Sequence, residues 1–285
     1  MEQVILVTGA SSGIGAAAAK ELAAQGAIVY GAARRVERIP EGVLPLKMDL
    51  ADEASVQAGV ERILQEQGRI DVLVNNAGYG YFGPIETVTL EEARRQLEVN
   101  VFGLAALTRL VIPAMRERGS GRIVNVASVA GRSVLYFGGW YNVSKFAVEA
   151  FSDALRIELE PFGVKVVIVE PGAIRTEWGP IAARHLRESS QGTAYARDGE
   201  NYASNLERTY SSEKLFSKPE VVSRAIVKAV NARRPRTRYR VGIGAGFMVH
   251  AHSLLPDRWW DALMRQVGRR QFLRRFLPGP TGSSI

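Results

Sequence analysis

Short apolar runs alternate along the chain with longer segments whose apolar positions recur at helical spacing. The short runs end in turns rich in glycine or polar residues and predict buried strands, whereas the longer segments predict helices. Strands that alternate with helices indicate an α/β fold, a doubly wound parallel β-sheet with helices on both faces. The predicted strands are Val4–Thr8, Ile28–Ala33, Val43–Met48, Val72–Val74, Arg122–Val126 and Val164–Val169, and the predicted helices are Ile14–Gln25, 52–66, Leu90–Arg118, Tyr141–Glu160 and Pro219–Asn231.

No low-complexity linker divides the 285 residues, of which 46% are hydrophobic, so we expect one domain at 1–245 and a C-terminal helical extension at 246–285. Residues from about 174 to 216 are polar and weakly periodic, and we interpret them as a mobile lid. A first strand that starts by Val4 leaves no room for a signal peptide. The longest apolar run, Val241–Leu255, is too short to span a bilayer, so we expect a cytoplasmic protein.

The positive charge of the chain is concentrated near its C-terminus. The formal net charge is +8, yet residues 231–285 alone carry 11 arginines and two acids, a net +9 that leaves the rest at −1. No nucleic-acid-reading motif accompanies this charge, and we expect no nucleic-acid partner. The absence of cysteine excludes disulfides and thiolate metal sites, and the three histidines form no zinc motif, so no metal is expected.

The glycine-rich turn Thr8–Gly15 follows the first strand and opens the first helix. Its glycines permit a tight turn, a close backbone approach to a phosphate and close helix packing, and the helix N-terminus attracts an anion. A purely structural turn is the alternative, but this placement favours a dinucleotide site. The predicted contacts are Gly9, Ser11, Ser12, Gly13, Ile14 and Gly15.

The choice of dinucleotide depends on the end of the second strand. A site that prefers NAD places a carboxylate there, to accept a hydrogen bond from the ribose 2′-hydroxyl. Here the position is Ala33, followed by Arg34 and Arg35, and a guanidinium suits the 2′-phosphate of NADP. We therefore favour NADP(H) over NAD(H), with Arg34 as the better candidate. The alternative is that both arginines belong to a solvated loop.

Tyr141 and Lys145 are four residues apart in a predicted helix and share one of its faces, and Ser128 lies just past the fifth strand. An ammonium close to a phenol stabilises the phenolate and should lower the pKa of Tyr141 from about 10. A tyrosine tuned in this way can transfer a proton near neutral pH. The spacing alone is common by chance, and it becomes specific only beside a nucleotide site.

Taken together, these features resemble the short-chain dehydrogenases/reductases, in the branch with a single Rossmann domain. The resemblance extends from about residue 3 to 245, with every expected motif in family order. The motifs are Thr8–Gly15, Asp49, Asn75-Asn76-Ala77-Gly78, Asn100, Ser128, Tyr141-x-x-x-Lys145 and Pro171-Gly172.

The resemblance implies a role for each matching residue. Ser128 would orient a substrate oxygen, Tyr141 would act as general acid or base, and Lys145 would hold the nicotinamide ribose. Asn100 would anchor a water that relays protons to Lys145. Relatives commonly form dimers or tetramers through their two long helices, so a homo-oligomer is implied. The further implied cofactor contacts are Asp49 and Leu50 at the adenine, Asn75, Ala77 and Gly78 along the cofactor, with Asn75 also bracing the sheet, and Pro171, Gly172 and Thr176 near the nicotinamide.

The segments expected to line a substrate are rich in aromatic residues, which favours an apolar alcohol or ketone. Some of these rings can instead be core or subunit-interface residues. The pattern is weakly similar to that of steroid and retinol dehydrogenases. The aromatic candidates are Tyr79, Tyr81, Phe82, Tyr136, Phe137, Trp140 and Trp178, of which Tyr136 and Trp178 are the predicted substrate contacts.

The extension contains a predicted amphipathic helix at 257–267, with Arg258 and Arg265 beside an apolar stripe. Such a basic helix can lie in an anionic membrane surface, which would make the protein membrane-peripheral. Alternatively, the stripe packs on the domain or a partner subunit, and we slightly favour this interpretation. The stripe consists of Trp260, Leu263, Met264 and Val267, and the following basic residues Arg269, Arg270, Arg274 and Arg275 are interleaved with Phe272, Leu273, Phe276 and Leu277.

The sequence thus predicts an NADP(H)-dependent oxidoreductase that interconverts a secondary alcohol and a carbonyl of an apolar, steroid-, retinoid- or lipid-like molecule. The rival hypothesis is a catalytically idle, NADP-sensing interaction protein on the same fold. An epimerase or dehydratase is a third alternative, although such relatives usually carry larger substrate domains.

Overall fold

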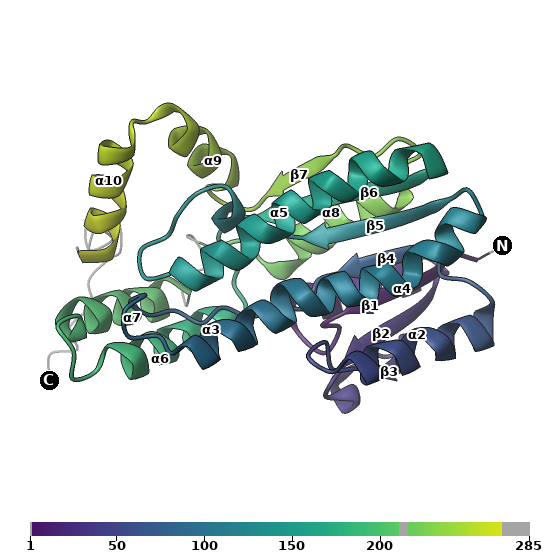
Figure 1. The fold of residues 1–285 in the computed structure, drawn as a ribbon, viewed down its shortest axis with the longest axis horizontal. Coiled ribbons are helices and arrows are strands. Elements are labelled where there is room, and N and C mark those ends of the chain that lie inside the picture. The colour runs from purple at the N-terminus through teal and green to yellow at the C-terminus, as the bar shows by residue number, and fades with distance from the viewer. Residues whose placement is uncertain (1, 211–215, 270–285) are drawn as a thin grey trace, which may run out of the picture.

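Seven strands form one parallel sheet in a computed structural model that describes residues 2–210 and 216–269 (Figure 1). The spatial order is β3-β2-β1-β4-β5-β6-β7, so the chain changes direction across the sheet between β1 and β4. Ligands of such sheets bind beyond the carboxyl ends of the strands at this switch point. The strands are β1 (Val4–Thr8), β2 (Ile28–Ala33), β3 (Leu44–Lys47), β4 (Val72–Asn75), β5 (Gly121–Val126), β6 (Val164–Pro171) and β7 (Arg238–Val241).

Helices cover both faces of the sheet, with α2, α4 and α5 in front in Figure 1 and α8 behind, packed beside α1. The helices are α1 (Gly13–Ala24), α2 (Glu53–Gln67), α3 (Leu90–Leu97), α4 (Leu104–Glu117), α5 (Gly139–Leu159), α6 (Trp178–Ser190), α7 (Ala196–Tyr210), α8 (Pro219–Asn231), α9 (Ala245–Leu254) and α10 (Asp257–Arg269). A π-helical turn, η2 (Glu98–Gly103), joins α3 to α4, and short 3-10 turns are η1 (Val36–Arg38), η3 (Val129–Gly131) and η4 (Glu160–Phe162).

Alternating side chains of the strands supply two separate cores. In β1, Val4 and Leu6 pack with α2, α4 and α5, whereas Ile5 and Val7 pack with α1 and α8. This is the two-sided burial that a parallel sheet requires, and it explains why the strands appear in the sequence as continuous apolar runs. The predicted fold class is therefore confirmed.

Most predicted elements agree with the structure, and several coincide with it. The strands Val4–Thr8 and Ile28–Ala33 and the helix Pro219–Asn231 have the predicted bounds. The carboxylate of Asp52 accepts hydrogen bonds from the backbone of α2, and Gly68 ends that helix with φ of 70°. These ends were predictable because capping chemistry is local.

The elements that the prediction missed lie in the second half of the chain. The segment predicted as a lid contains two helices, α6 and α7, which pack against each other. Strand β7 was also missed, whereas α9 lies in the extension that was predicted to be helical, without bounds for this helix. Strand β7 reads Arg-Tyr-Arg-Val, and its two arginines point to buried acids of the neighbouring elements, so it lacks the apolar pattern of a buried strand.

The predicted amphipathic helix is α10, but its apolar stripe faces the protein. Trp260 is only 4% exposed and its indole Nε1 donates to the carbonyl of Val134 at 3.3 Å. Helix α10 also packs on α7. The favoured alternative, a stripe packed on the domain, is thus what the structure has. The basic and apolar positions from 270 onward lie outside the described residues.

Among the described residues, one helical stretch, Leu90–Glu117, is long and apolar enough to span a membrane by length and composition alone. This stretch is longer than the run that the sequence analysis singled out. Its inner face belongs to the core, because Leu107, Val111 and Met115 of α4 are buried against the sheet.

A buried charge cluster fastens β7 to the long helix α5. The guanidinium of Arg238 reaches Glu149 and Asp153 on α5 at 3.1 and 2.6 Å, and Glu170 on β6 at 3.1 Å. Glu149 and Glu170 are almost fully buried. Burial, and then the neighbouring charge of Glu170, raise the pKa of Glu149 to about 7.

Replacing Arg238→Ala should lower the free energy of unfolding by about 3–5 kcal/mol, because the buried Glu149 loses the guanidinium that pairs with it, whereas Glu170 keeps its pair with Arg240 at 2.6 Å. Urea unfolding at about pH 8 measures this loss, and the loss should shrink at about pH 5.5, where a proton on Glu149 removes its charge. The matched control is Arg62→Ala, which breaks an exposed pair with Glu66 and should cost less than about 1 kcal/mol. Equal losses in the two variants would contradict this prediction.

Candidate active site

The predicted site residues come together at one edge of the sheet. Parallel strands end at the same edge, so the segments that follow β1, β4, β5 and β6 meet there. These segments carry, in chain order, the turn from Gly9 to Gly15, the run from Asn75 to Gly78, Ser128, and the segment from Gly172 to Thr176.

The turn after β1 is locked to the segment after β4. The hydroxyl of Thr8 accepts hydrogen bonds from the backbone N–H groups of Asn76 and Ala77, each at 3.0 Å. The side-chain amide of Asn76 donates to the carbonyl of Thr8 at 3.0 Å. Gly9 has φ of 68°, and a Cβ there would lie 2.9 Å from the Cα of Ala77, so glycine is required by conformation and by space.

The amino end of α1 is available for an anion. Its N-cap residue, Ser12, makes no side-chain capping hydrogen bond, and the first turn of the helix holds no acid. Gly13 has φ of 55°, and a Cβ there would point toward the side chain of Thr176 at 3.4 Å. The free N–H groups and the space above them fit a pyrophosphate, so the residues present fit a dinucleotide.

The residues predicted to contact the nucleoside end lie at the ends of the next two strands. Arg34 follows β2, is exposed, and within the described part of the chain has no recorded ion pair or hydrogen bond of its side chain. After β3, the carboxylate of Asp49 accepts from the N–H of Ala51 at 3.1 Å. Leu50 is buried, and its carbonyl would lie 2.2 Å from a Cβ on Gly103. The segment after β3 therefore packs closely against the π-helical turn η2.

Asn75 braces the sheet, as the resemblance implied. Its side-chain amide donates to Thr108 on α4 at 3.0 Å and to Asn125 on β5 at 2.9 Å. Asn125 in turn donates to Ser152 on α5 at 2.8 Å. Both strands that flank the centre of the site are thereby fixed to the two long helices.

Asn100 lies in the π-helical turn η2 and holds the segment after β4 from the other side. Its carbonyl accepts from the N–H of Tyr79 at 3.0 Å, and its amide donates to the carbonyl of Tyr79 at 2.8 Å and to Ser144 at 3.1 Å. π-Turns are frequent at functional sites. A Cβ on Gly78 would lie 3.0 Å from the Asn100 carbonyl and 3.8 Å from Nζ of Lys145, so these groups share one small space.

Ser128, Tyr141 and Lys145 form a buried group. Ser128 lies just after β5, where its hydroxyl accepts from the N–H of Ala130 at 3.1 Å, and it is close enough to Tyr141 to act on the pKa of the phenol. The ammonium of Lys145 donates to the carbonyl of Val126 at 3.0 Å and lies 6.0 Å from the centroid of the Tyr141 ring. The predicted cluster of tyrosine, serine and lysine is therefore present.

The predicted direction of the tyrosine pKa is wrong for this enclosed state. Burial raises the pKa of Tyr141 to about 12, and the hydrogen bond from Ser128 opposes only part of that rise. Burial also lowers the pKa of Lys145 to about 8, against the attraction of Glu149. Desolvation disfavours the charged forms of both groups and outweighs their mutual stabilisation.

Aromatic side chains enclose Tyr141, which is 9% exposed. The ring of Trp178 lies 5.2 Å from that of Tyr141 between centroids, and the ring of Phe82 lies 5.9 Å away. Tyr210 stacks on the outer side of Trp178 at 6.0 Å. Trp178, a predicted substrate contact, therefore borders the reactive phenol directly.

Tyr136, the other predicted contact, lies in a second row of rings. It packs on Phe137 at 4.1 Å and on Tyr202 at 6.0 Å, rather than on Tyr141. Phe137 has φ of 56°, an uncommon value for a bulky residue, and the N–H of Gly83 donates to its carbonyl. Strain of this kind persists where surrounding contacts fix the backbone.

The sequence analysis missed two rings of this enclosure, Tyr202 and Tyr210 on α7. A signal was present, because Tyr202, Leu206 and Tyr210 follow one another at the four-residue spacing of a helical face. The polar residues between them concealed it.

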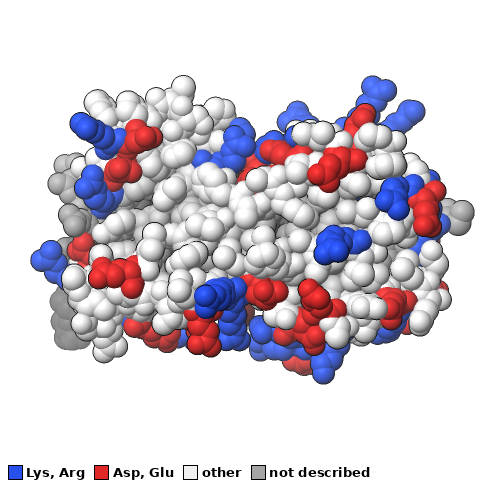
Figure 2. Space-filling model, in the orientation of Figure 1, with Lys and Arg blue, Asp and Glu red and all other residues white. Residues whose placement is uncertain are grey.

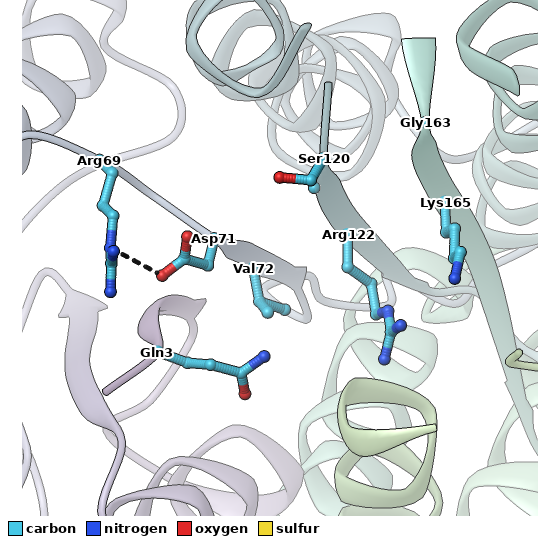
Figure 3. Close-up of a pocket in the computed structure, with 9 residues that line it drawn as sticks. Gln3, Arg69, Asp71, Val72, Ser120, Arg122, Gly163 and Lys165 are labelled. Atoms are coloured by element: carbon cyan, nitrogen blue, oxygen red, sulfur yellow. Dashed lines mark ion pairs between the residues drawn. The ribbon is translucent and has the colours of Figure 1, made fainter. Parts of the chain in front are cut away.

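A cavity of about 350 Å³ lies at the opposite edge of the sheet, where the strands begin (Figure 3). Its charged groups are already engaged within the protein. Arg69 pairs with Asp71 at 3.1 Å, Arg122 donates to the carbonyl of Ala232 at 2.8 Å, and Lys165 donates to the carbonyl of Arg233. This cavity therefore supports structure around the C-terminus of α8 and is not part of the site above.

The model of the short chain dehydrogenase family matches residues 3–184. The chain belongs to this family. Two curated relatives and one solved structure are among the proteins that the chain resembles. A 3-ketodihydrosphingosine reductase of Bacteroides thetaiotaomicron is 37% identical over 92% of this chain and 97% of its own length. An NADPH-dependent 3-dehydrocapnine reductase of Ornithobacterium rhinotracheale is 36% identical over 90% of this chain and 94% of its own.

The crystal structure of a short-chain dehydrogenase from Streptomyces avermitilis has a TM-score of 0.74 and 33% identity, covering 97% of this chain and 98% of its own. These matches extend well beyond the family model, into the C-terminal part. The protein is thus an NAD(P)-dependent oxidoreductase of the short-chain dehydrogenase family, acting on CH–OH groups.

The lowered pKa of Lys145 predicts a stability that rises with pH. Between about pH 8 and 10.5 the unfolded chain binds a proton that the folded protein does not, so the free energy of unfolding increases through this window. From about pH 8 to 9.5 the increase should be on the order of 1–2 kcal/mol. Urea unfolding measures it, and Lys145→Met should abolish it while the exposed Lys47→Met retains it. A flat profile in the wild-type protein would contradict the prediction.

Proposed function

We propose that the protein is an NADP(H)-dependent reductase of an apolar ketone, running in reverse as an alcohol dehydrogenase. The observation that carries this proposal is the pair of neighbouring hydroxyls on Ser128 and Tyr141, the latter enclosed by aromatic rings, at the edge where a dinucleotide fits. Two donors at one point suit a carbonyl oxygen that gains negative charge.

Tyr141 is the proton donor in this proposal. Its raised pKa keeps the phenol protonated through the physiological range, which suits the reductive direction, where an acid must protonate the developing alkoxide. Ser128 orients the carbonyl by donating to the same oxygen. Lys145, with a pKa of about 8, is mostly charged near pH 7 and favours proton release from the phenol.

The cofactor contacts follow from the same edge of the sheet. The N-terminus of α1 would hold the pyrophosphate, and the unpaired guanidinium of Arg34 would meet a 2′-phosphate. When bound, the reduced nicotinamide supplies the hydride. The NADPH dependence in the name of the Ornithobacterium relative supports the preference for NADP(H).

An apolar ketone is the substrate class that the enclosure favours. Trp178, Phe82 and Tyr210 offer faces to hydrocarbon, and Tyr141 is reached only if rings of this enclosure move. Relatives named as reductases of a 3-keto and a 3-dehydro compound support a ketone. We extend that support to this chain as a proposal, with the two long helices α4 and α5 as the proposed subunit interface.

Tyr141→Phe should lower turnover by at least about 10²-fold, because the proton donor is lost while the ring and its packing remain. NADPH oxidation with a panel of apolar ketones measures turnover, and NADPH fluorescence measures cofactor binding, which should stay within about twofold. Tyr30→Phe, at a buried tyrosine that bonds Glu66 far from the site, is the matched control and should keep full turnover. A Tyr141→Phe variant with normal turnover would refute the proposed mechanism.

Arg34→Gln should weaken NADPH binding by about 10- to 100-fold, the value of a charge-assisted contact to phosphate, and leave NADH binding within about twofold. Titrations with both cofactors measure the two affinities. Arg38→Gln, four residues further on and also exposed, should bind NADPH like the wild-type protein. If Arg34→Gln weakens both cofactors equally, or the wild-type protein prefers NADH, the assignment of Arg34 is wrong.

A further inference from the structure

Helix α9 carries no charged residue, and only its inner face is covered. Its ten residues, Ala245–Leu254, include no lysine, arginine, aspartate or glutamate. Ala245 and Val249 are buried and pack on Val129, next to the catalytic serine. Phe247, His250 and Leu254 share the outer face at helical spacing and are exposed. Large apolar side chains exposed on a helix without charged residues are typical of a face that contacts another surface.

Three of the four most exposed large apolar side chains that the structure describes lie at one corner of the molecule. Leu254 is 81% exposed, Phe247 is 74% exposed, and Trp259, at the start of α10, is 70% exposed. Of the large apolar side chains that the structure describes, Ile157 is the only other one exposed to 70% or more. The α9–α10 corner stands at the upper left in Figure 1, where Figure 2 shows uncharged surface together with both basic and acidic side chains. Concentrated apolar exposure of this kind marks an interaction site.

The C-terminal part of the sequence, from residue 242 onward, carries a net charge of +4. Residues 242–285 contain six arginines, no lysine or glutamate, and only two acids, Asp257 and Asp261. Arg258 and Arg265 on α10 are exposed. Sixteen further residues follow the end of α10, and in them Arg270, Arg274 and Arg275 are interleaved with phenylalanine and leucine. The complement of an apolar face beside arginines is a surface that is both apolar and anionic.

We propose that α9 and the first turn of α10 dock on an anionic lipid bilayer. Phe247, Leu254 and Trp259 enter the headgroup region, where aromatic and aliphatic side chains lose contact with water, and Arg258 and Arg265 lie near lipid phosphates. The docking face is thus not the stripe that the sequence suggested, since Trp260 of that stripe is buried against the protein. This inference does not depend on the proposed function.

Docking at this corner would place the bilayer beside the enclosure of Tyr141. Helix α10 packs on α7, and α7 contributes Tyr202 and Tyr210 to the aromatic rings. Helix α9 packs on η3, directly after Ser128. Both walls of the substrate region are therefore in contact with the docking elements.

Vesicle co-sedimentation of the full-length protein tests the proposal. The wild-type protein should bind vesicles of equal parts phosphatidylglycerol and phosphatidylcholine at least about tenfold more tightly than vesicles of phosphatidylcholine alone. The double variant Phe247→Glu/Leu254→Glu should bind the anionic vesicles at least about tenfold more weakly. Ile157→Glu, at an equally exposed apolar residue on α5, is the matched control and should bind like the wild-type protein. Circular dichroism melting confirms that each variant is folded.

Tryptophan fluorescence locates the contact. Emission of the wild-type protein should shift to shorter wavelength when anionic vesicles are added, because Trp259 leaves water, and Trp259→Phe should lose that shift while it still sediments with vesicles. Loss of the shift in Ile157→Glu, or its persistence in Trp259→Phe, would overturn the assigned contact.

The competing occupant of this face is a second copy of the chain. Sedimentation velocity without vesicles distinguishes the two, because the docking proposal expects Phe247→Glu/Leu254→Glu to keep the mass of the wild-type assembly. The proposal would be overturned if the wild-type protein did not bind anionic vesicles, or if the double variant had a lower assembly mass than the wild-type protein in sedimentation velocity.

Discussion

The hydroxyl of Thr8 holds together the segments that follow two strands, β1 and β4, which are distant in the sequence. By accepting the backbone N–H groups of Asn76 and Ala77, it holds the segment after β4 against the turn after β1. This contact joins two parts of the site, because the anion position at α1 lies on one side of it and Tyr79, held by Asn100, lies on the other. The glycines here are required because two backbones approach more closely than side chains allow.

Desolvation governs the chemistry of the site. From sequence, Tyr141 and Lys145 are a pair that lowers the phenol's pKa, but the enclosed structure raises that pKa and lowers that of the lysine. The prediction from sequence considered only the attraction between the two charges, whereas burial shifts the pKa of each group separately. The protein therefore keeps a neutral acid and a weakened cation in a dry space, and opening of the aromatic enclosure would change both.

The sequence predicted the first half of the chain well and the second half less well, for physical reasons. Strands such as Val4–Thr8 are covered on both faces, so they consist of consecutive apolar residues that the sequence shows directly. The glycine turn and the helix cap at Asp52 depend only on residues close in the sequence. Strand β7 is held by charges that other elements neutralise, and α6 and α7 bury faces mainly against each other. The sequence of β7, or of α6 or α7 alone, does not reveal the element that neutralises its charges or covers its face. The predicted site residues lie together at one edge of the sheet, as family spacing led us to expect, but spacing carries no information about solvation.

The π-helical turn at Asn100 also has a geometric consequence for the helix that contains it. A wide turn adds one residue without breaking the rod, and one residue corresponds to a rotation of about 100°. Helix α4 keeps Leu107 and Val111 on the sheet, while α3 still directs Ala93 and Gln96 inward. The turn therefore rotates α4 relative to α3, so that each helix keeps its own buried face. It also lets the polar side chain of Asn100 enter the interior between them. Removal of a single residue from the turn would shorten the helix very little but would rotate α3 relative to α4.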